Sequence, residues 1–391
     1  MKTLPDNPHL DHLRRQAKDL LAGLRDVRPD ATLTDAQASL ADQYGFRTWT
    51  DLKAEVDRRQ GRTDVADPAL ARQIAARFGL GEVVGEMRSL SRPDEMGRRW
   101  LLRTDRGHWA PRTVDDVYPV TDGEDDARFQ QAAARAGVTL PATVRSGSGA
   151  VTETIAGSRW RVYEWLRSGP PLSAPVSATI TRAVGDILAT LHGLRVPVDG
   201  ISPWSAVRLS SLGWAELADR AAAQGAGWAP VLAAAVPALV ELQAVGERAA
   251  PGDPVLCHQN LNPGNVRVGA NGRLIVTGWE HAGGLPPAWE LSAALASWAV
   301  NPGGGVNAAG ARALADGYRA RAGTLPPLSL GTFRGAATAL QNYVAGEIGL
   351  ALDARGEEDA RFTDRNVRHL LTHLPSRATY ERVLEAALPG S

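Results

Sequence analysis

Polar side chains that can bind a metal or move a proton gather between residues 257 and 281, among apolar runs and turn-forming residues. The imidazole of His258, the carboxamides of Asn260 and Asn265 and the carboxylate of Glu280 are the main candidates. Oxygen ligands of this kind suit Mg²⁺, whereas a carboxamide carries no charge and is not a base. The segment can therefore ligate a metal through oxygen, but Asn260 cannot take a proton as a catalytic base would.

Short elements must position these groups. Two apolar runs, 266–268 and 274–276, flank the dipeptide Asn-Gly at 271–272, which is typical of a β-hairpin turn. A helix is predicted over 288–299 from its apolar periodicity. The sequence thus predicts a polar loop at 258–265, followed by a β-hairpin and then a helix.

The loop also carries a family resemblance. Residues 258–265 read His-Gln-Asn-Leu-Asn-Pro-Gly-Asn, which resembles the catalytic loop His-Gly-Asp-Leu-His-Pro-Gly-Asn of the aminoglycoside phosphotransferase and choline kinase family. In that family a hairpin leads on to Ile-Asp-Trp-Glu, and here residues 277–280 read Thr-Gly-Trp-Glu. The Pro-Ala-Trp-Glu-Leu at 287–291 resembles the helix start that follows, so order and spacing agree throughout this stretch.

The preceding part of the chain resembles the amino lobe of the same family. Residues 100–109 resemble the hairpin that carries the ATP-binding lysine, and Arg112 falls where that lysine is expected. Tyr163, Glu164 and Trp165 belong to a stretch that resembles the hinge, whose backbone meets adenine in active members. The resemblance therefore implies that these four residues face a nucleotide.

The resemblance implies an α+β, two-lobed protein-kinase-like fold, with a mixed-sheet amino lobe and a mainly helical carboxyl lobe. Ahead of it, apolar residues recur at helical spacing and predict a small all-helical module, followed by a Gly- and Pro-containing linker. We predict the module at 1–60, the linker at 61–69, the amino lobe at 70–167 and the helical lobe at 168–391, with the catalytic-type loop at 258–280.

Hydrophobic periodicity and turn signals also predict the other elements. Strands are expected at 85–90, 99–104, 108–114 and 160–165, and helices at 125–136, 180–192, 228–248, 308–322, 332–352 and, as closing helices, 368–384.

Phosphoryl transfer is mainly positioning and charge neutralisation, and the groups that supply both are altered in this chain. Asn260 stands in place of the aspartate that takes the acceptor proton, and loss of a general base costs roughly 10²–10⁴-fold. Gly278 stands in place of a metal-binding aspartate, although Asn265 keeps its position as a metal ligand. Arg112 replaces the lysine, and the turn at 91–97, with one glycine and two acidic residues, is a poor phosphate cradle.

Each change has an alternative interpretation. Asn260 alone is compatible with a slow kinase, because the transition state of phosphoryl transfer is loose. Glu280 is a candidate metal ligand that compensates for Gly278. The resemblance implies that His258 supports the loop, and Glu290 is expected to cap or brace the catalytic segment.

Other reactive or aromatic residues have structural explanations. Cys257 lies in an apolar run and is expected to be a buried small hydrophobe. His281 follows a carboxylate, but adjacent residues on a strand point to opposite faces, which argues against a metal pair. Trp204, Trp214 and Trp228 lie where the family binds its acceptor, and we favour core packing over a pocket for a flat or apolar ligand.

Composition limits the classes of partner. With 43 basic and 43 acidic residues, the formal net charge of +0 gives no electrostatic case for nucleic acid or an acidic membrane surface. A single cysteine excludes an internal disulfide. No signal peptide or membrane-spanning stretch is predicted, so a cytoplasmic location is expected.

Two principal hypotheses follow. The first is a pseudokinase that binds a small molecule, peptide or protein partner in the cleft or the helical lobe without efficient phosphoryl transfer, and to which no cofactor is assigned. The second is a divergent phosphotransferase that uses ATP and Mg²⁺ on a hydroxyl of an antibiotic, small metabolite or peptide. A third hypothesis makes the 1–60 module the working part and the kinase-like domain its scaffold.

Overall fold

The computed structural model describes residues 4, 8–27, 29–44, 46, 49–59, 65–90, 98–114, 122–245, 252–301, 304–353 and 357–388. The chain forms two compact units, which are described separately. The first unit comprises Met1–Asp115 and Val144–Trp165, and the second comprises Asp116–Thr143 and Leu166–Ser391.

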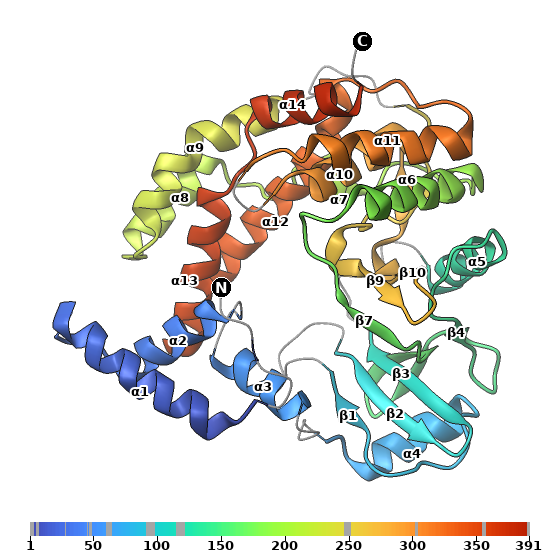
Figure 1. Cartoon of the computed structure of the whole chain (residues 1–391), viewed down its shortest axis with the longest axis horizontal. Helices are drawn as coiled ribbons and strands as arrows, with labels where there is room; N and C mark the ends of the chain where they lie inside the picture. The colour runs from blue at the N-terminus through green and yellow to red at the C-terminus, as the bar shows by residue number, and fades with distance from the viewer. Residues whose placement is uncertain are drawn as a thin grey trace. The chain divides into compact units, whose positions relative to one another are not determined.

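The first unit begins with three short helices that share a small apolar core (Figure 1). They are α1 (Leu10–Val27), α2 (Leu33–Gln43) and α3 (Trp49–Arg59). Thr32 caps α2, because its hydroxyl accepts from the Asp35 amide while the Asp35 carboxylate accepts from the Thr32 amide. The helical character of this segment agrees with the sequence. The residue types also indicate a helix end at Gly45 and a helix cap at Thr48, and both positions lie outside the described residues.

An antiparallel sheet and one helix form the rest of the first unit. The helix is α4 (Pro68–Arg77), and its apolar side packs on one face of the sheet around Ile74, Trp100 and Val162. The strands run in the order β1-β2-β3-β6-β4, with β5 paired to β6. Their bounds are β1 (Arg88–Ser89), β2 (Trp100–Thr104), β3 (Gly107–Thr113), β4 (Thr143–Val144), β5 (Glu153–Ile155) and β6 (Ser158–Glu164). The hairpin that the resemblance implies over residues 100–109 is confirmed, because β2 and β3 pair antiparallel through a tight turn between Thr104 and Gly107.

The second unit is mainly helical (Figure 1). Its helices are α5 (Gly123–Arg135), α6 (Ala178–Gly193), α7 (Pro203–Ala206), α8 (Trp214–Ala223), α9 (Ala229–Ala244), α10 (Pro287–Ala299), α11 (Ala308–Ala322), α12 (Arg334–Leu352), α13 (Glu357–Thr372) and α14 (Arg377–Ala387). Its strands are β7 (Ser168–Pro171), β8 (Val255–Cys257), β9 (Val266–Gly269), β10 (Leu274–Val276) and β11 (Gly283–Leu285). One sheet-containing unit and one mainly helical unit agree with the predicted α+β class, although the paired strands of the first unit are antiparallel where a mixed sheet was predicted.

Two glycines let α6 and α11 approach each other closely. A Cβ atom on Gly185 would lie 2.0 Å from the Leu314 carbonyl oxygen, and one on Gly317 would lie 2.0 Å from the Arg182 carbonyl oxygen. Only glycine fits where two backbones come this near. The contact fixes α6 in the main core of the second unit, and α6 carries His192 next to the loop described below.

The closing helices expected at 368–384 correspond to α13 and α14, which are separated by a break that ends at the Ser376 cap. Trp214 and Trp228 are buried in a second apolar core formed by α8, α9, α12 and α13, so the expectation of core packing is confirmed for both. Trp204 on α7 is half-buried.

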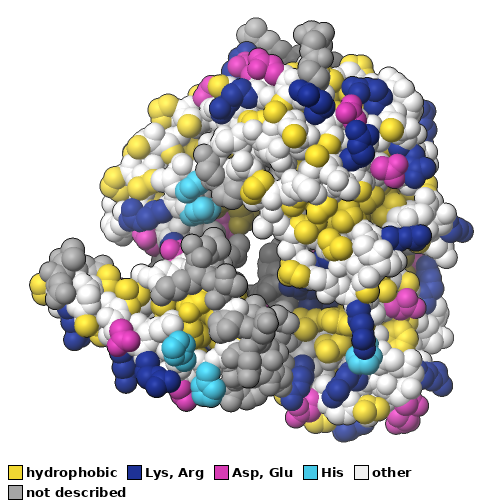
Figure 2. All heavy atoms as spheres, viewed as in Figure 1, with side chains coloured by type: hydrophobic (Ala, Val, Ile, Leu, Met, Phe, Trp, Pro, Cys, Tyr) yellow, Lys and Arg dark blue, Asp and Glu magenta, His cyan; other side chains and the backbone are white. Residues whose placement is uncertain are grey.

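The surface shows no strong separation of charge on the face drawn in Figure 2, where basic and acidic side chains are interspersed. None of the described helices combines the length and apolar character needed to cross a bilayer.

Candidate catalytic-type loop and its buried brace

The loop at 258–265 is held between two pairs of strands in the second unit. Before it, β8 pairs with β11, and after it, β9 and β10 form the predicted antiparallel hairpin. Gly272 has φ +76°, the left-handed conformation that the Asn-Gly turn requires. The β9 strand also pairs with β7, which gives a three-stranded sheet beneath the loop.

Three asparagines form a continuous hydrogen-bonded chain within the loop. The Asn262 amide nitrogen donates to Asn260 Oδ1 at 2.6 Å, and Asn262 Oδ1 accepts from the Gly264 backbone at 2.9 Å. Asn265 Nδ2 donates to the Asn260 carbonyl oxygen at 2.9 Å. The structure therefore brings the predicted residues Asn260 and Asn265 together, with the Asn260 carboxamide oxygen already accepting a hydrogen bond from Asn262.

His258 is buried and electrically neutral. Its Nε2 lies 3.1 Å from the Thr277 carbonyl oxygen, and its Nδ1 accepts from the Asn260 amide at 3.2 Å, so the proton must be on Nε2. The ring also meets the Trp279 ring edge-on, at 4.7 Å between centroids. Burial lowers the pKa of His258 to about 4, despite the opposing influence of Glu290 and Glu280. This histidine fixes the loop conformation and is not an acid or base near neutral pH.

Gln259 occupies the position that is glycine in the family loop, and its backbone keeps the left-handed conformation, with φ +60°. A non-glycine residue there stores roughly 1–2 kcal/mol of strain. Its side-chain oxygen lies 3.4 Å from the Ser205 hydroxyl on α7, and its side-chain nitrogen lies 3.4 Å from the Gly284 carbonyl oxygen. The side chain thus links the loop to α7 and β11, which no local sequence signal indicated.

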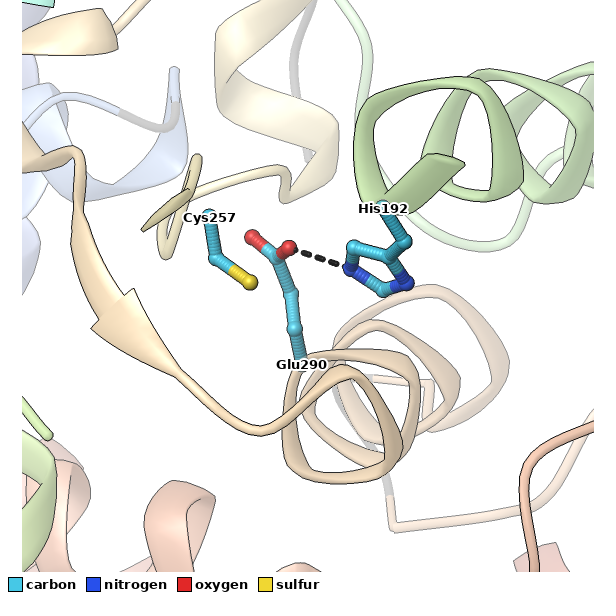
Figure 3. A group of neighbouring side chains, drawn as sticks. All are labelled: His192, Cys257 and Glu290. Atoms are coloured by element: carbon cyan, nitrogen blue, oxygen red, sulfur yellow. Dashed lines mark hydrogen bonds and ion pairs between the residues drawn. The ribbon is translucent and has the colours of Figure 1, made fainter. Parts of the chain in front are cut away.

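A buried carboxylate braces the loop, as expected for Glu290 (Figure 3). Glu290 accepts from the backbone N–H of Gln259 through one oxygen, and from His192 Nε2 at 2.7 Å through the other. Tyr318 lies 2.9 Å from His192 Nδ1, and burial raises the pKa of its hydroxyl, which therefore keeps its proton and donates. Burial opposes ionisation of Glu290, but hydrogen bonds from His192 and Gln259, and the nearby imidazoles, hold its pKa below the ordinary value.

Cys257 completes this buried group. Its Sγ lies within 4.8 Å of ligand atoms of His192 and Glu290, the only such convergence of three or more His, Cys, Asp or Glu among the described residues. The thiol donates to the Leu285 carbonyl oxygen, and burial raises its pKa well above the ordinary value. Because the carboxylate accepts from two donors and the thiol donates to Leu285, the three side chains act as a brace for the loop in this structure. The expectation that Cys257 is buried is confirmed.

A neighbouring side chain packs closely against residue 278. Gly278 adopts φ +83°, and a Cβ atom there would lie 2.6–2.8 Å from the carboxamide atoms of Asn265. Asn265 thus packs against the position from which an aspartate side chain would extend. Residue 278 supplies no carboxylate, and the role of Asn265 as a metal ligand stays a prediction.

Glu280 and His281 lie just beyond, on a 3₁₀ turn at Trp279–His281. Their side chains approach to 4.0 Å between Glu280 Oε1 and His281 Nε2. The expectation that the two side chains point apart was wrong, because it assumed a strand where the backbone forms a tight turn. Whether Glu280 replaces the missing metal ligand stays a prediction.

The other predicted residues belong to the first unit. Arg112 lies opposite Arg161 on β6, and Tyr163 and Glu164 lie opposite Ala110 and Trp109 on β3. The Trp165 amide donates to the His108 carbonyl oxygen. Their role in nucleotide binding stays a prediction, and the expected phosphate turn at 91–97 lies outside the described residues.

A small antiparallel sheet unit, a helical unit and a loop–hairpin–turn segment braced by a buried carboxylate together define a kinase-like phosphotransferase fold. A model of the phosphotransferase enzyme family (APH) matches residues 89–324, more than half of the chain. The chain belongs to this family.

Solved structures agree with this assignment at the level of the fold. Spectinomycin phosphotransferase APH(9)-Ia, in complex with ADP and spectinomycin, is 12% identical with a TM-score of 0.57, covering 83% of this chain and 99% of that one. Amicoumacin kinase hAmiN, in complex with AMP-PNP, Ca²⁺ and Ami, is 13% identical with a TM-score of 0.53, covering 82% and 96%. No curated protein sequence matches the chain.

Proposed function

We propose that this protein is a phosphotransferase-family pseudokinase that binds a small molecule, peptide or protein without efficient phosphoryl transfer. The absence of a carboxylate at residue 278 carries the proposal, because Asn265 packs against the position from which an aspartate side chain would extend. Asn260 adds to this, because its amide is not a base.

The hydrogen bonds of Glu290 to His192 and to the Gln259 amide support a folded protein that binds a ligand over one that has lost its function altogether. Glu290, His192 and the Gln259 amide still hold the loop in place, although the loop no longer carries a carboxylate. The loop keeps its conformation although it lacks a carboxylate, so we favour a function that depends on the conformation of the loop.

A turnover assay with the full chain tests the proposal. The protein is incubated with ATP and Mg²⁺ and a panel of hydroxyl-bearing antibiotics, amines, sugars and peptides, and ADP release is followed. We expect release no faster than with protein-free buffer. Mg²⁺-dependent release that is abolished by Asn265→Ala, but kept by Asn271→Ala in the hairpin turn, would overturn it.

A second candidate function is a divergent ATP-dependent phosphotransferase. It is favoured by the retained Asn265 and Glu280 and by the related structures, whose names describe kinases with bound nucleotides. It predicts that Asn260→Asp combined with Gly278→Asp raises ADP release, provided that Asn265 can move away from residue 278. A folded double variant that releases no ADP with any acceptor would count against this function.

A further inference from the structure

Three side chains whose atoms can bind a metal converge in the interior of the second unit (Figure 3). His192 is in the last turn of α6, Cys257 is the last residue of β8, and Glu290 is in the first turn of α10. Their ligand atoms all lie within 4.8 Å of one another, and the three residues are at most 5% exposed. Three separate elements thus bring a nitrogen, a sulfur and an oxygen donor together away from solvent.

The donor set selects the kind of ion. A thiolate sulfur, an imidazole nitrogen and a carboxylate oxygen are the protein ligands of Zn²⁺, whereas Mg²⁺ and Ca²⁺ take oxygen ligands. Donors around a tetrahedral Zn²⁺ are about 3.3–3.8 Å apart, so atoms that already lie within 4.8 Å need to move by roughly 1 Å. The charges also balance, because one thiolate and one carboxylate neutralise a divalent ion, and buried charges are normally paired or bound to metals.

Neighbouring groups hold two of the three ligands in position. Tyr318 lies 2.9 Å from Nδ1 of His192, and one oxygen of Glu290 accepts from the Gln259 backbone. Contacts of this kind, made to the outer atom of an imidazole or a carboxylate, orient the metal ligands of proteins. They leave Nε2 of His192 and the other oxygen of Glu290, which are 2.7 Å apart, available to one ion.

We propose that His192, Cys257 and Glu290 bind a Zn²⁺ ion in the interior of the second unit. In the metal-free brace, the Cys257 thiol donates to Leu285 and the His192 Nε2–H donates to Glu290. On metal binding, the thiol proton leaves to solvent, and the imidazole proton moves from Nε2 to Nδ1, where the Tyr318 oxygen accepts it. One proton is therefore released for each ion bound.

The ion would join three elements beside the loop at 258–265. It would replace the hydrogen bond between α6 and α10 with bonds to metal, and it would add β8 to the same centre. A metal that binds the folded chain and not the unfolded one contributes its binding energy to folding. The site does not depend on whether the protein transfers phosphoryl groups.

Cobalt absorption of the full chain tests the proposal, because Cys257 is the only cysteine in the sequence. The chain is produced in minimal medium that contains Co²⁺ in place of Zn²⁺ and is purified without chelators. We expect one cobalt ion per chain by mass spectrometry of the metal, with thiolate-to-cobalt charge-transfer absorption and the visible bands of tetrahedral cobalt. Since the chain has one thiol, charge-transfer absorption identifies the ligand directly.

Variants identify the other ligands. We expect Cys257→Ser to remove the charge-transfer absorption, and His192→Gln to remove most of the bound cobalt. Tyr318→Phe should lower the affinity by roughly 10–100-fold in competition with chelators, because Nδ1 of the imidazole loses its acceptor. The control is His373→Gln, which removes an exposed imidazole that stacks on His369 and should leave the absorption unchanged.

Circular dichroism establishes that each variant is folded, and Tyr318→Phe carries the test if the ligand variants are not. The proposal is wrong if the full chain shows no charge-transfer absorption, or if folded His192→Gln and Tyr318→Phe bind cobalt as the unaltered chain does. Cobalt that is lost in His373→Gln and kept in Cys257→Ser would be an adventitious surface ion only and would also overturn it. None of these results bears on the proposed function, and ADP release in the turnover assay would leave the zinc site unaffected.

Discussion

At the scale of single residues, Gly278 is the position on which the proposed function depends most. It offers no side chain, and its left-handed backbone lies against the Asn265 carboxamide. The two effects can be separated because Gly272 has a similar φ of +76° but no atom within 4 Å of its missing Cβ.

We therefore expect Gly278→Ala to lower the free energy of unfolding by roughly 1–3 kcal/mol more than Gly272→Ala does. Both variants carry the cost of a left-handed alanine, and only the first must displace Asn265. Urea unfolding of the two variants measures the difference. Equal destabilisation would show that Asn265 does not occupy the space at residue 278.

His258 makes a second residue-scale prediction, which concerns pH. Its folded pKa of about 4 lies below the ordinary 6.5, so the unfolded chain takes up the proton first. The stability it contributes is complete above pH 6.5 and is lost as the pH falls toward 4, a loss of about 3 kcal/mol in all.

Urea unfolding measured between pH 7 and pH 5 checks this dependence. We expect His258→Gln to flatten the fall in stability over this range, while His108→Gln, at an exposed position on β3, leaves it unchanged. The stability that ionised Glu290 contributes is also lost in acid, but only as the pH falls below its ordinary pKa of 4.5, which lies outside this interval. An unaltered slope in the His258 variant would contradict the burial argument.

At the scale of elements, the loop depends on contacts from α6 and α10. Glu290 on α10 joins His192 at the end of α6 to the Gln259 amide, so one carboxylate holds two helices and the loop together (Figure 3). Removing one partner of such a buried pair leaves the other without compensation.

We expect Glu290→Gln to lower the free energy of unfolding by about 3 kcal/mol and to speed hydrogen exchange at the Gln259 amide. Glu241→Gln, at an exposed position on α9, is the matched control and should change neither quantity. A double-mutant cycle with His192→Gln should give a coupling of roughly 1–3 kcal/mol. Additive effects would mean that the two side chains act independently.

At the scale of the whole molecule, the amino-terminal helices have a core of their own. Leu13, Leu40, Leu52 and Val56 pack with each other and with residues of the same three helices. This separate core suits the hypothesis that the module recruits a partner while the kinase-like part serves as its scaffold.

We expect Leu40→Ala to destabilise the module by about 2–5 kcal/mol and to leave the second unit intact. Hydrogen exchange read by mass spectrometry should lose protection in α1–α3 but not in α6 or α10. Leu33→Ala, at an exposed position on α2, is the control and should show little change. Loss of protection in both units would show that the module is part of one cooperative structure.

Much of the candidate site was predictable because its residues lie close together in the sequence. The loop, the Asn-Gly hairpin and the turn after it lie within residues 258–280, so their order and turn residues specify their conformation. The expected brace by Glu290 was also correct. Its partner His192 was missed, because a histidine ending a mostly apolar helix gives no local sign of a contact 98 residues away.

The sequence by itself determined the family, the fold class and the absence of carboxylates at positions 260 and 278, since short motifs specify each of them. Tertiary structure alone decided that Asn265 fills the space beside Gly278, that Trp214 and Trp228 are core residues, and that Arg112 lies opposite Arg161. These outcomes depend on strand register and on packing between distant segments. The physical reason is that a side chain's neighbours across strands and helices are set by the folded backbone, not by adjacent residues.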